Sequence, residues 1–224
     1  MQTEPSAEGK VLAVLTGKAV AYTRPGSTSA IAKHPVKSAV HCGPLGFEGD
    51  EQADRRVHGG IVKAVHLYSF DHYPWWREQL GPIEKLSSFG AFGENLSVSG
   101  QTEHSVCQGD QYQVGEAILE VSQGRQPCWK LSNHLGVPDM VKRVQQTRRA
   151  GWYCRVLKPG QIQAGDSLSL IARPFPNWTL DRLLRVIFDP KTPVDEVREC
   201  LEIPLPDSWR KILQSRAAKS AGRG

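Results

Sequence analysis

Short apolar runs separated by glycine-containing turns dominate the chain from Lys10 to about Ala172. Runs of this kind with β-branched members are typical of β-strands. The strands that we expect are Val11–Leu15, Ala19–Thr23, Ala30–Val36, Lys63–Tyr68, Gln111–Val114, Glu116–Ser122, Gly151–Leu157 and Ser167–Ala172. Glycine turns predict hairpins between the first two of these strands and between Gln111–Val114 and Glu116–Ser122. The pattern favours a closed or nearly closed barrel over a parallel sheet with crossovers.

Helical patterns interrupt this barrel twice. The aromatic run Phe70–Leu80 ends at Gly81 and Pro82, and Val137–Arg149 carries apolar residues at helical spacing. We therefore predict a fold that is mainly β with α, in which two helices are inserted into the barrel.

Beyond a proline-rich joint at Arg173–Asn177 the pattern is helical throughout. Thr179 is expected to cap one helix, and Thr192 a second that has Pro193 at its first position. Asp207–Arg216 makes a third. The expected domains are a β-barrel over 10–172 and a three-helix segment over 178–217.

Bulk composition limits the class of protein. The 224 residues are 39% apolar, enough for one large domain or a domain with a small appendage. No apolar stretch is long enough to span a bilayer, and Gly17-Lys18 cuts short the one candidate signal core, Val11–Leu15. Five cysteines without two-residue spacing argue against a disulfide framework and a zinc ribbon. We expect a cytoplasmic protein with reduced thiols and no membrane partner.

The net charge of +5 comes largely from the end of the chain, where Arg210, Lys211, Arg216, Lys219 and Arg223 follow Asp207 without an acid. Nucleic-acid binding is one interpretation. A solvated helix end is commoner, so we expect no nucleic-acid partner. The positive balance also suits an anionic cofactor or a phosphorylated substrate.

One thiol, Cys128, follows a predicted strand in the segment Gln123–Trp129. Gly124 permits backbone angles that other residues avoid, and Pro127 stiffens the approach. Arg125 places a cation nearby, which favours the thiolate, the form that attacks electrophiles or ligates metals. The alternative is a small buried hydrophobe, because free cysteine is among the most buried residue types.

The loop over 46–60 combines glycines with acids and a histidine. Gly59 and Gly60 lack side chains where the chain can approach a ligand. The polar candidates are Asp50, Asp54 and His58. The two aspartates offer hydrogen-bond acceptors, and the histidine offers an imidazole that can titrate near neutrality. A polar turn in which aspartates bond their own backbone explains the same residues.

Further polar patches are less specific. Phe89–Leu96 places glycines beside Glu94 and Asn95, and Asn95 either reads a ligand's hydrogen-bonding edge or forms a turn. Cys107–Asp110 and Ala164–Asp166 are expected to begin strands. The histidines share no recognised ligand spacing, so a metal site built on histidine alone is weakly supported. A nucleophilic pair of Cys128 and His58 stays a hypothesis.

Taken together, these stretches resemble the MOSC domain, the C-terminal domain of molybdenum cofactor sulfurases, and are most similar to its bacterial YiiM-like branch. The matching pieces are Ser29–Lys33, Gly46–Asp54, His58–Gly60 with Lys63–Val65, Phe92–Leu96, Cys107–Asp110, Gly115–Gln123 and Pro127-Cys128. The end of the chain, with Trp209, is similar to that branch's three-helix tail. Where the branch usually has Pro-Asp after His-Gly-Gly, this chain has Ile61-Val62, and Gln123-Gly-Arg125 replaces Gln-Pro-Arg.

The resemblance implies a β-barrel in which Cys128 carries sulfur or ligates molybdenum. It also implies a molybdenum cofactor (molybdopterin) and the reduction of N-hydroxylated bases such as 6-N-hydroxylaminopurine, a detoxification. The roles that follow are phosphate binding by Arg125 and Lys33, orientation of the pterin by Glu94 and Asn95 or by Asp50, and proton relay by His58 or Asp54.

Two functional interpretations remain open, beside a weaker third in which the basic helical tail makes the chain an interaction module. The first is a molybdenum-cofactor-dependent oxidoreductase acting on a small N-hydroxylated substrate. The second is a carrier in which Cys128 holds a persulfide or hands on the cofactor. The sequence has no iron–sulfur cysteine spacing and no glycine-rich dinucleotide fingerprint, so the oxidoreductase would need a separate electron-donor protein. The quaternary state, a homodimer included, stays open.

Overall fold

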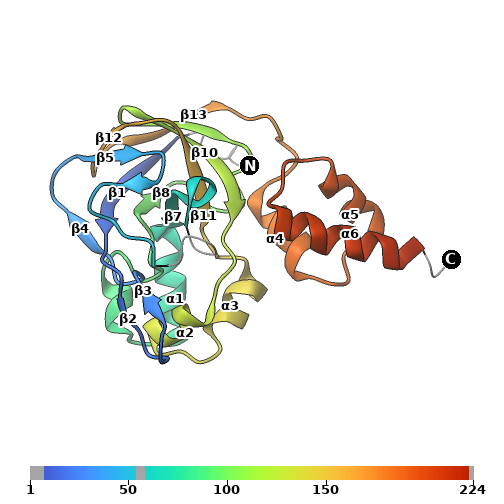
Figure 1. The fold of residues 1–224 in the computed structure, drawn as a ribbon, viewed down its shortest axis with the longest axis horizontal. Helices are drawn as coiled ribbons and strands as arrows, with labels where there is room; N and C mark the ends of the chain where they lie inside the picture. The colour runs from blue at the N-terminus through green and yellow to red at the C-terminus, as the bar shows by residue number, and fades with distance from the viewer. Residues whose placement is uncertain (1–7, 54–58, 222–224) are drawn as a thin grey trace.

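A computed structural model describes residues 8–53 and 59–221 and contains a closed barrel (Figure 1). The strand order around the ring is β13-β9-β10-β11-β7-β8-β1, and β13 pairs back with β1. These strands are β1 (Glu8–Thr16), β7 (Val65–Ser69), β8 (Leu96–Ser99), β9 (Gln111–Val114), β10 (Ala117–Gly124), β11 (Trp152–Lys158) and β13 (Ser167–Ala172). Within the ring, β7 and β8 pair in parallel and the other neighbours are antiparallel. The predicted barrel is confirmed.

The hairpin of β9 and β10 shows how the sequence pattern builds this barrel. Tyr112, Val114, Leu119 and Val121 are buried and alternate with more exposed residues, so the two strands turn one face to the core. Gly115 connects them at φ 54°, where a Cβ would lie 2.5 Å from a backbone oxygen. Both the steric space and the backbone angle therefore favour glycine at this turn, and the predicted hairpin is confirmed.

The smaller strands depart from the prediction. β2 (Val20–Ala21) pairs with β3 (Thr28–Ser29), so the predicted hairpin between Val11–Leu15 and Ala19–Thr23 is wrong. The edges of β1 are taken by β8, β13 and β4 (His34–Val36). Only β4 forms within the predicted strand Ala30–Val36. A further sheet joins β12 (Gly160–Ile162), β5 (Val40–Gly43) and β6 (Gly46–Phe47).

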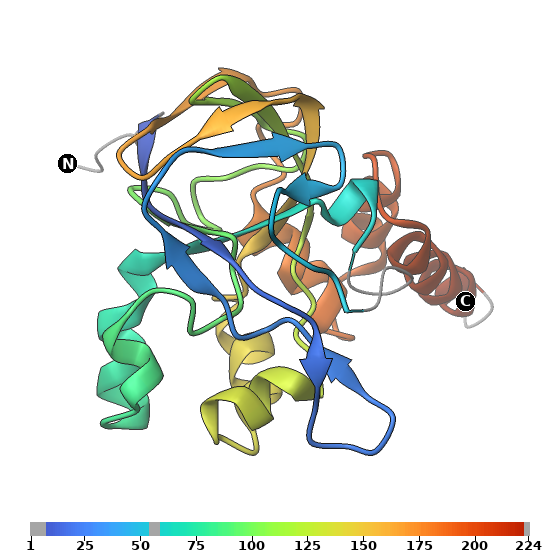
Figure 2. The ribbon, with the colours of Figure 1, turned by 60° about the vertical axis from the view of Figure 1, so that its left-hand side comes forward.

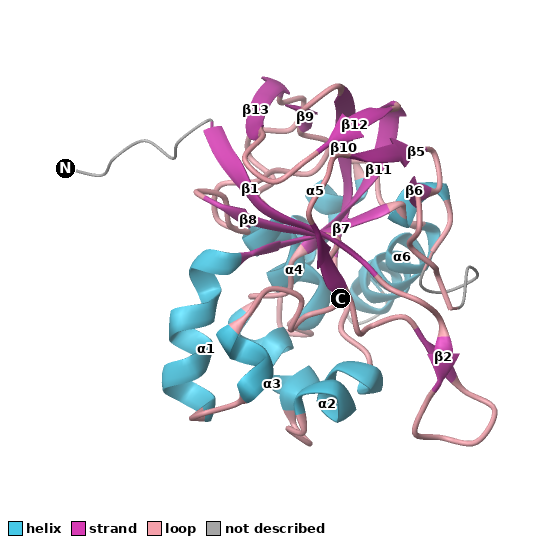
Figure 3. Cartoon of the chain, turned by 90° about the vertical axis from the view of Figure 1, so that its left-hand side faces the viewer, coloured by secondary structure: helices cyan, strands magenta, loops and turns pink. Residues whose placement is uncertain are grey.

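Three helices gather at one end of the barrel (Figure 3). They are α1 (Tyr73–Leu80), α2 (Trp129–Leu135) and α3 (Met140–Thr147). A 3-10 turn over Phe70–His72 leads into α1, which confirms the predicted helix, whereas α3 is shorter than predicted. The Trp76 indole donates to the Tyr68 hydroxyl at 2.7 Å, and the Tyr68 ring stacks on Phe92 at 3.9 Å. These contacts fix α1 against the barrel core.

The last three helices form a lobe beside the barrel (Figures 1 and 2). They are α4 (Leu180–Phe188), α5 (Val194–Leu201) and α6 (Asp207–Ala221). The lobe is joined to the barrel side by a backbone bond from Leu180 N to Val106 O at 2.8 Å and by an ion pair of Arg148 with Asp181 at 2.6 Å. Among residues 8–53 and 59–221, no helix is long and apolar enough to cross a membrane.

The two predicted helix caps have different outcomes. Thr179 is the N-cap of α4, and its hydroxyl accepts a hydrogen bond from Arg182 N at 3.2 Å. For α5 the N-cap is Pro193, so the predicted cap at Thr192 is wrong. The Thr192 hydroxyl instead donates to Asp189 O at 2.9 Å, which closes the turn after α4.

Candidate functional site

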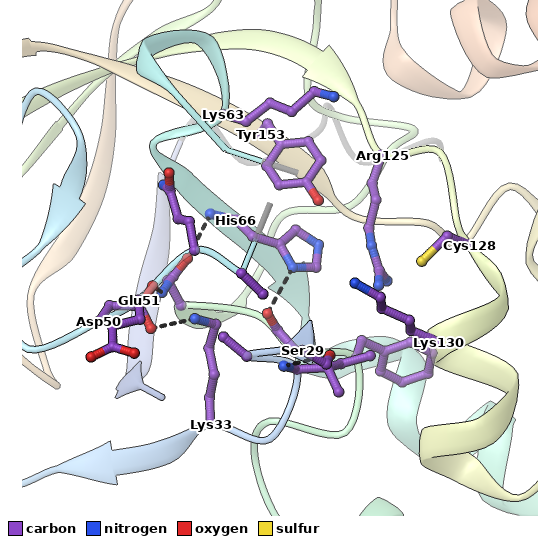
Figure 4. A pocket seen from close by; sticks show the side chains of 17 residues that line it. Ser29, Lys33, Asp50, Glu51, Lys63, His66, Arg125, Cys128, Lys130 and Tyr153 are labelled. Carbon is purple, nitrogen blue, oxygen red and sulfur yellow. Dashed lines mark hydrogen bonds and ion pairs between the residues drawn. The ribbon is translucent and has the colours of Figure 1, made fainter. Parts of the chain in front are cut away.

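A pocket of about 630 Å³, counted with its open mouth, lies where several loops meet the barrel strands β7 and β11. The loops at 29–33, 50–53, 92–95 and 125–130 bring its walls together from distant parts of the sequence (Figure 4). Five predicted site residues line it: Lys33, Asp50, Asn95, Arg125 and Cys128.

Cys128 is partly exposed and its sulfur lies beside Arg125 and Lys130 (Figure 4). The residue is the N-cap of α2, which the sequence pattern did not predict. The other four cysteines are buried. Burial raises the pKa of Cys42 to about 12 and that of Cys107 to about 11. Cys128 is therefore the cysteine that a solute can reach.

Arg125 brings a buried cation to the same wall. It is 6% exposed, and its backbone N–H donates to Gly151 O at 2.9 Å, which fixes the main chain between β10 and α2. The Nη1 atom of its guanidinium is buried without a hydrogen-bond partner. A buried charged donor without a partner is costly, so this atom marks a place where a ligand oxygen would be stabilised.

Lys33, Asp50 and Asn95 bond mainly to one another. The Lys33 ammonium pairs with the Asp50 carboxylate, which also accepts from Gly17 N at 2.8 Å and from the Asn95 amide at 2.9 Å. The Asn95 amide oxygen in turn accepts from His66 N at 3.1 Å. Burial lowers the pKa of Lys33, and the Asp50 carboxylate opposes this shift. Since Lys33 and Asp50 neutralise each other, they hold the wall of the pocket.

Glu94 was predicted to orient a pterin, but it lies outside the pocket lining and is fully buried. Its carboxylate accepts from the Tyr73 hydroxyl at 2.6 Å, the Ser97 hydroxyl at 2.7 Å and the backbone N–H groups of Gly90 and Phe92. These bonds fold the loop before β8, and we assign Glu94 a structural role.

The two glycines of the predicted loop make room for a neighbouring side chain. A Cβ on Gly59 would lie 2.2 Å from the Gln52 amide oxygen, and that oxygen accepts from Gly60 N at 3.0 Å. Gln52 lines the pocket, whereas the glycines do not. The predicted catalytic residues Asp54 and His58 lie outside the described residues.

His66 also lines the pocket, although the spacing of the histidines gave only weak support to any of them as a metal ligand. It is 4% exposed, on the fully buried strand β7. Its Nδ1 lies 3.2 Å from Gly93 O, and its Nε2 has no hydrogen-bond partner. Burial, and then the cations of Arg125 and Lys33, hold the pKa of His66 well below its usual value. An imidazole on an otherwise apolar strand was the signal that could have identified it.

The described part of the lining carries four cations and two carboxylates. Glu51 pairs outward with Lys18 at 3.0 Å, and Asp50 is neutralised by Lys33. Lys130 donates to Thr28 O at 2.7 Å, a neutral acceptor. The surroundings of Cys128 are therefore electropositive. Among residues 8–53 and 59–221, no three His, Cys, Asp or Glu side chains are grouped to hold a metal ion.

A closed barrel that presents one reachable thiol in an electropositive pocket, followed by three helices, defines the class of protein. Residues 54–169 match the MOSC domain, and residues 178–219 match the YiiM-like 3-alpha helix domain. The chain belongs to the MOSC domain family.

Relatives of known sequence and structure extend this result. The chain is 37% identical to the protein YiiM of Escherichia coli, over 91% of this chain and 90% of that one. It is 42% identical to YflK of Bacillus subtilis, covering 83% of each. A reductase of Gibberella moniliformis is 42% identical over 84% of this chain, which spans only 34% of that protein. The crystal structure of YiiM from Geobacillus stearothermophilus superposes with a TM-score of 0.78 at 31% identity, covering 93% of this chain and 99% of that one.

Proposed function

We propose that the protein is an oxidoreductase that uses molybdenum cofactor to reduce N-hydroxylated bases such as 6-N-hydroxylaminopurine. The observation that carries the proposal is the position of Cys128, a partly exposed thiol in a pocket whose Arg125 has a buried nitrogen without a partner. Membership of the MOSC family and the name of the Gibberella moniliformis relative, a reductase, support it.

The residues present fit such a cofactor. Molybdenum accepts a thiolate ligand, which Cys128 offers, and the cofactor is anionic, which suits the electropositive wall. With Lys33 paired to Asp50, the positive charges that lie beside Cys128 are those of Arg125 and Lys130 (Figure 4). Arginine can bind a phosphate oxygen through two parallel N–H donors.

When bound, the cofactor would supply the two-electron chemistry that breaks an N–O bond. The chain's own contribution is to bind and orient. Cys128 would hold the metal at the wall between β10 and α2, while Arg125 and Lys130 would neutralise negative charge beside it. His66, kept neutral by burial and the neighbouring cations, would offer an unprotonated nitrogen. Electrons would come from a separate electron-donor protein.

Cofactor loading of the Cys128→Ser variant tests this proposal. We expect wild-type protein, loaded without oxygen, to retain about one molybdenum per chain by metal analysis and to reduce 6-N-hydroxylaminopurine. The variant should lose both the metal and the activity, because serine supplies no thiolate. Cys200→Ala, in the helical lobe away from the pocket, is the control and should retain both.

Two results would contradict the proposal. Cyanide-labile sulfur on Cys128 without bound molybdenum would identify a sulfur carrier instead. Full molybdenum loading of Cys128→Ser would show that the thiol is not the ligand.

A further inference from the structure

Two buried polar atoms in the pocket lack partners, and their hydrogen-bonding characters are complementary. Nη1 of Arg125 can only donate. Nδ1 of His66 faces the carbonyl of Gly93 at 3.2 Å, and a carbonyl only accepts. In the neutral ring the proton therefore belongs on Nδ1, which makes Nε2 an acceptor. The low pKa of His66, caused by burial and then by Arg125, agrees with a neutral ring.

These two atoms belong to one site. His66 and Arg125 both line the pocket, and Figure 4 shows their side chains directed toward the same space next to Cys128 and Tyr153. His66 is 4% and Arg125 6% exposed. The ring of Tyr153 lies 5.1 Å from that of His66, which limits the directions from which a ligand can approach. The Ala150 carbonyl also lies near the ring, and because a carbonyl only accepts, it cannot bond Nε2 while that nitrogen is unprotonated.

We infer that Arg125 and His66 together recognise the hydroxyl group of the N-hydroxylated substrate, an inference that rests on the proposed function. Arg125 donates to the hydroxyl oxygen, and Nε2 of His66 accepts the hydroxyl hydrogen. A hydroxyl satisfies both atoms because it donates once and also accepts. Arginine has five N–H donors, so one bond to the hydroxyl leaves others for an anionic oxygen of the cofactor.

The amine product lacks the hydroxyl oxygen and leaves both atoms unpaired. Sites built to bond a hydroxyl discriminate strongly against analogues without it. This arrangement therefore favours substrate over product, and it makes His66 a residue that sets specificity.

Calorimetric binding of 6-N-hydroxylaminopurine and adenine, which differ only in the hydroxyl, tests the inference. Both are titrated into the protein as isolated and after cofactor loading. We expect the wild type to bind the hydroxylated base at least about tenfold more tightly than adenine. His66→Asn keeps an amide donor where Nδ1 stood but removes the acceptor at Nε2, so the preference for the hydroxylated base should fall to about a few-fold, the part that the Arg125 bond supplies. His66→Gln restores an acceptor near Nε2 and should recover part of the preference.

Circular dichroism and thermal melting of each variant show whether it is folded. Arg125→Lys is a further variant that weakens the bond to the hydroxyl oxygen independently of His66. Three results would each overturn the inference. They are equal binding of the two bases to wild type, no binding of either base, and an undiminished preference in folded His66→Asn. Failure of molybdenum loading with a preserved, His66-dependent preference would overturn the proposed redox function alone. Molybdenum loading and reduction with a preference independent of His66 would overturn only the inference.

Discussion

At the scale of single residues, the pocket combines one reachable thiol, Cys128, with a neutralised pair of charges, Lys33 and Asp50. Cys128 could be identified because glycine, arginine and proline surround it within a few positions. The pairing of Lys33 with Asp50 and the bond from Asn95 to Asp50 join residues 17 and 45 positions apart. No local pattern encodes such distances. For the same reason the sequence could not show that the Lys33 nitrogen has a partner while a buried nitrogen of Arg125 has none.

Selective alkylation tests the difference between Cys128 and the other thiols. Burial raises the pKa of Cys42 and of Cys200 to about 12, and that of Cys107 to about 11, so at pH 8 roughly one in a thousand or fewer of these groups is a thiolate. We expect iodoacetamide at pH 8 to add one adduct per native chain, at Cys128, as measured by intact mass and peptide mapping. The Cys128→Ser variant should stay unmodified over the same time. A second cysteine reacting at a similar rate would contradict this assignment.

At the scale of elements, the sequence indicated where some helices begin but not which elements they pack against. Thr179 was correctly predicted to cap α4, because an N-cap acts within its own turn. Carbonyl groups near the end of a helix in the lobe also accept hydrogen bonds from a residue far away in the sequence. Arg216 on α6 donates to Val186 O at 2.7 Å and Ile187 O at 2.8 Å, near the end of α4. The sequence had suggested that the basic end of the chain is a solvated helix end. Arg216 instead stabilises the lobe through these two bonds.

Removal of the α4 cap should have a measurable cost. We expect Thr179→Ala to lower the free energy of unfolding by about 1 kcal/mol, because Arg182 N loses its acceptor. Thr179→Ser keeps the hydroxyl and should lose much less. Urea denaturation followed by circular dichroism measures both variants. Equal losses in the two would show that the methyl group, and not the cap, is responsible.

At the scale of the whole molecule, barrel and lobe share one hydrophobic core. Gly124, the last residue of β10, lies against α4, and a Cβ there would be 2.8 Å from the Leu184 side chain. The sequence predicted a barrel and three helices but not this contact. Hydrophobic periodicity shows which face of a helix is buried and does not show which strand covers it.

A double-mutant cycle tests this contact. Gly124→Ala should overpack the interface and cost about 1–3 kcal/mol, and Leu184→Ala should leave a cavity and cost about 2–5 kcal/mol. We expect the double variant to be more stable than the two losses combined predict, because the added methyl group enters the vacated space. Chemical denaturation provides the three values. Simple additivity would argue against direct packing of Gly124 on Leu184.

The pairing of β1 with β13 has a consequence for synthesis of the chain. Residues 8–10 at the start of the barrel pair with residues 167–169 at its end. At ribosomal speed, the interval between these strands is on the order of ten seconds. Throughout that time the nascent protein has an open sheet edge, which other chains can join. Once β13 has been synthesised it can pair with β1, and the nascent chain is then no longer prone to aggregation through this open edge.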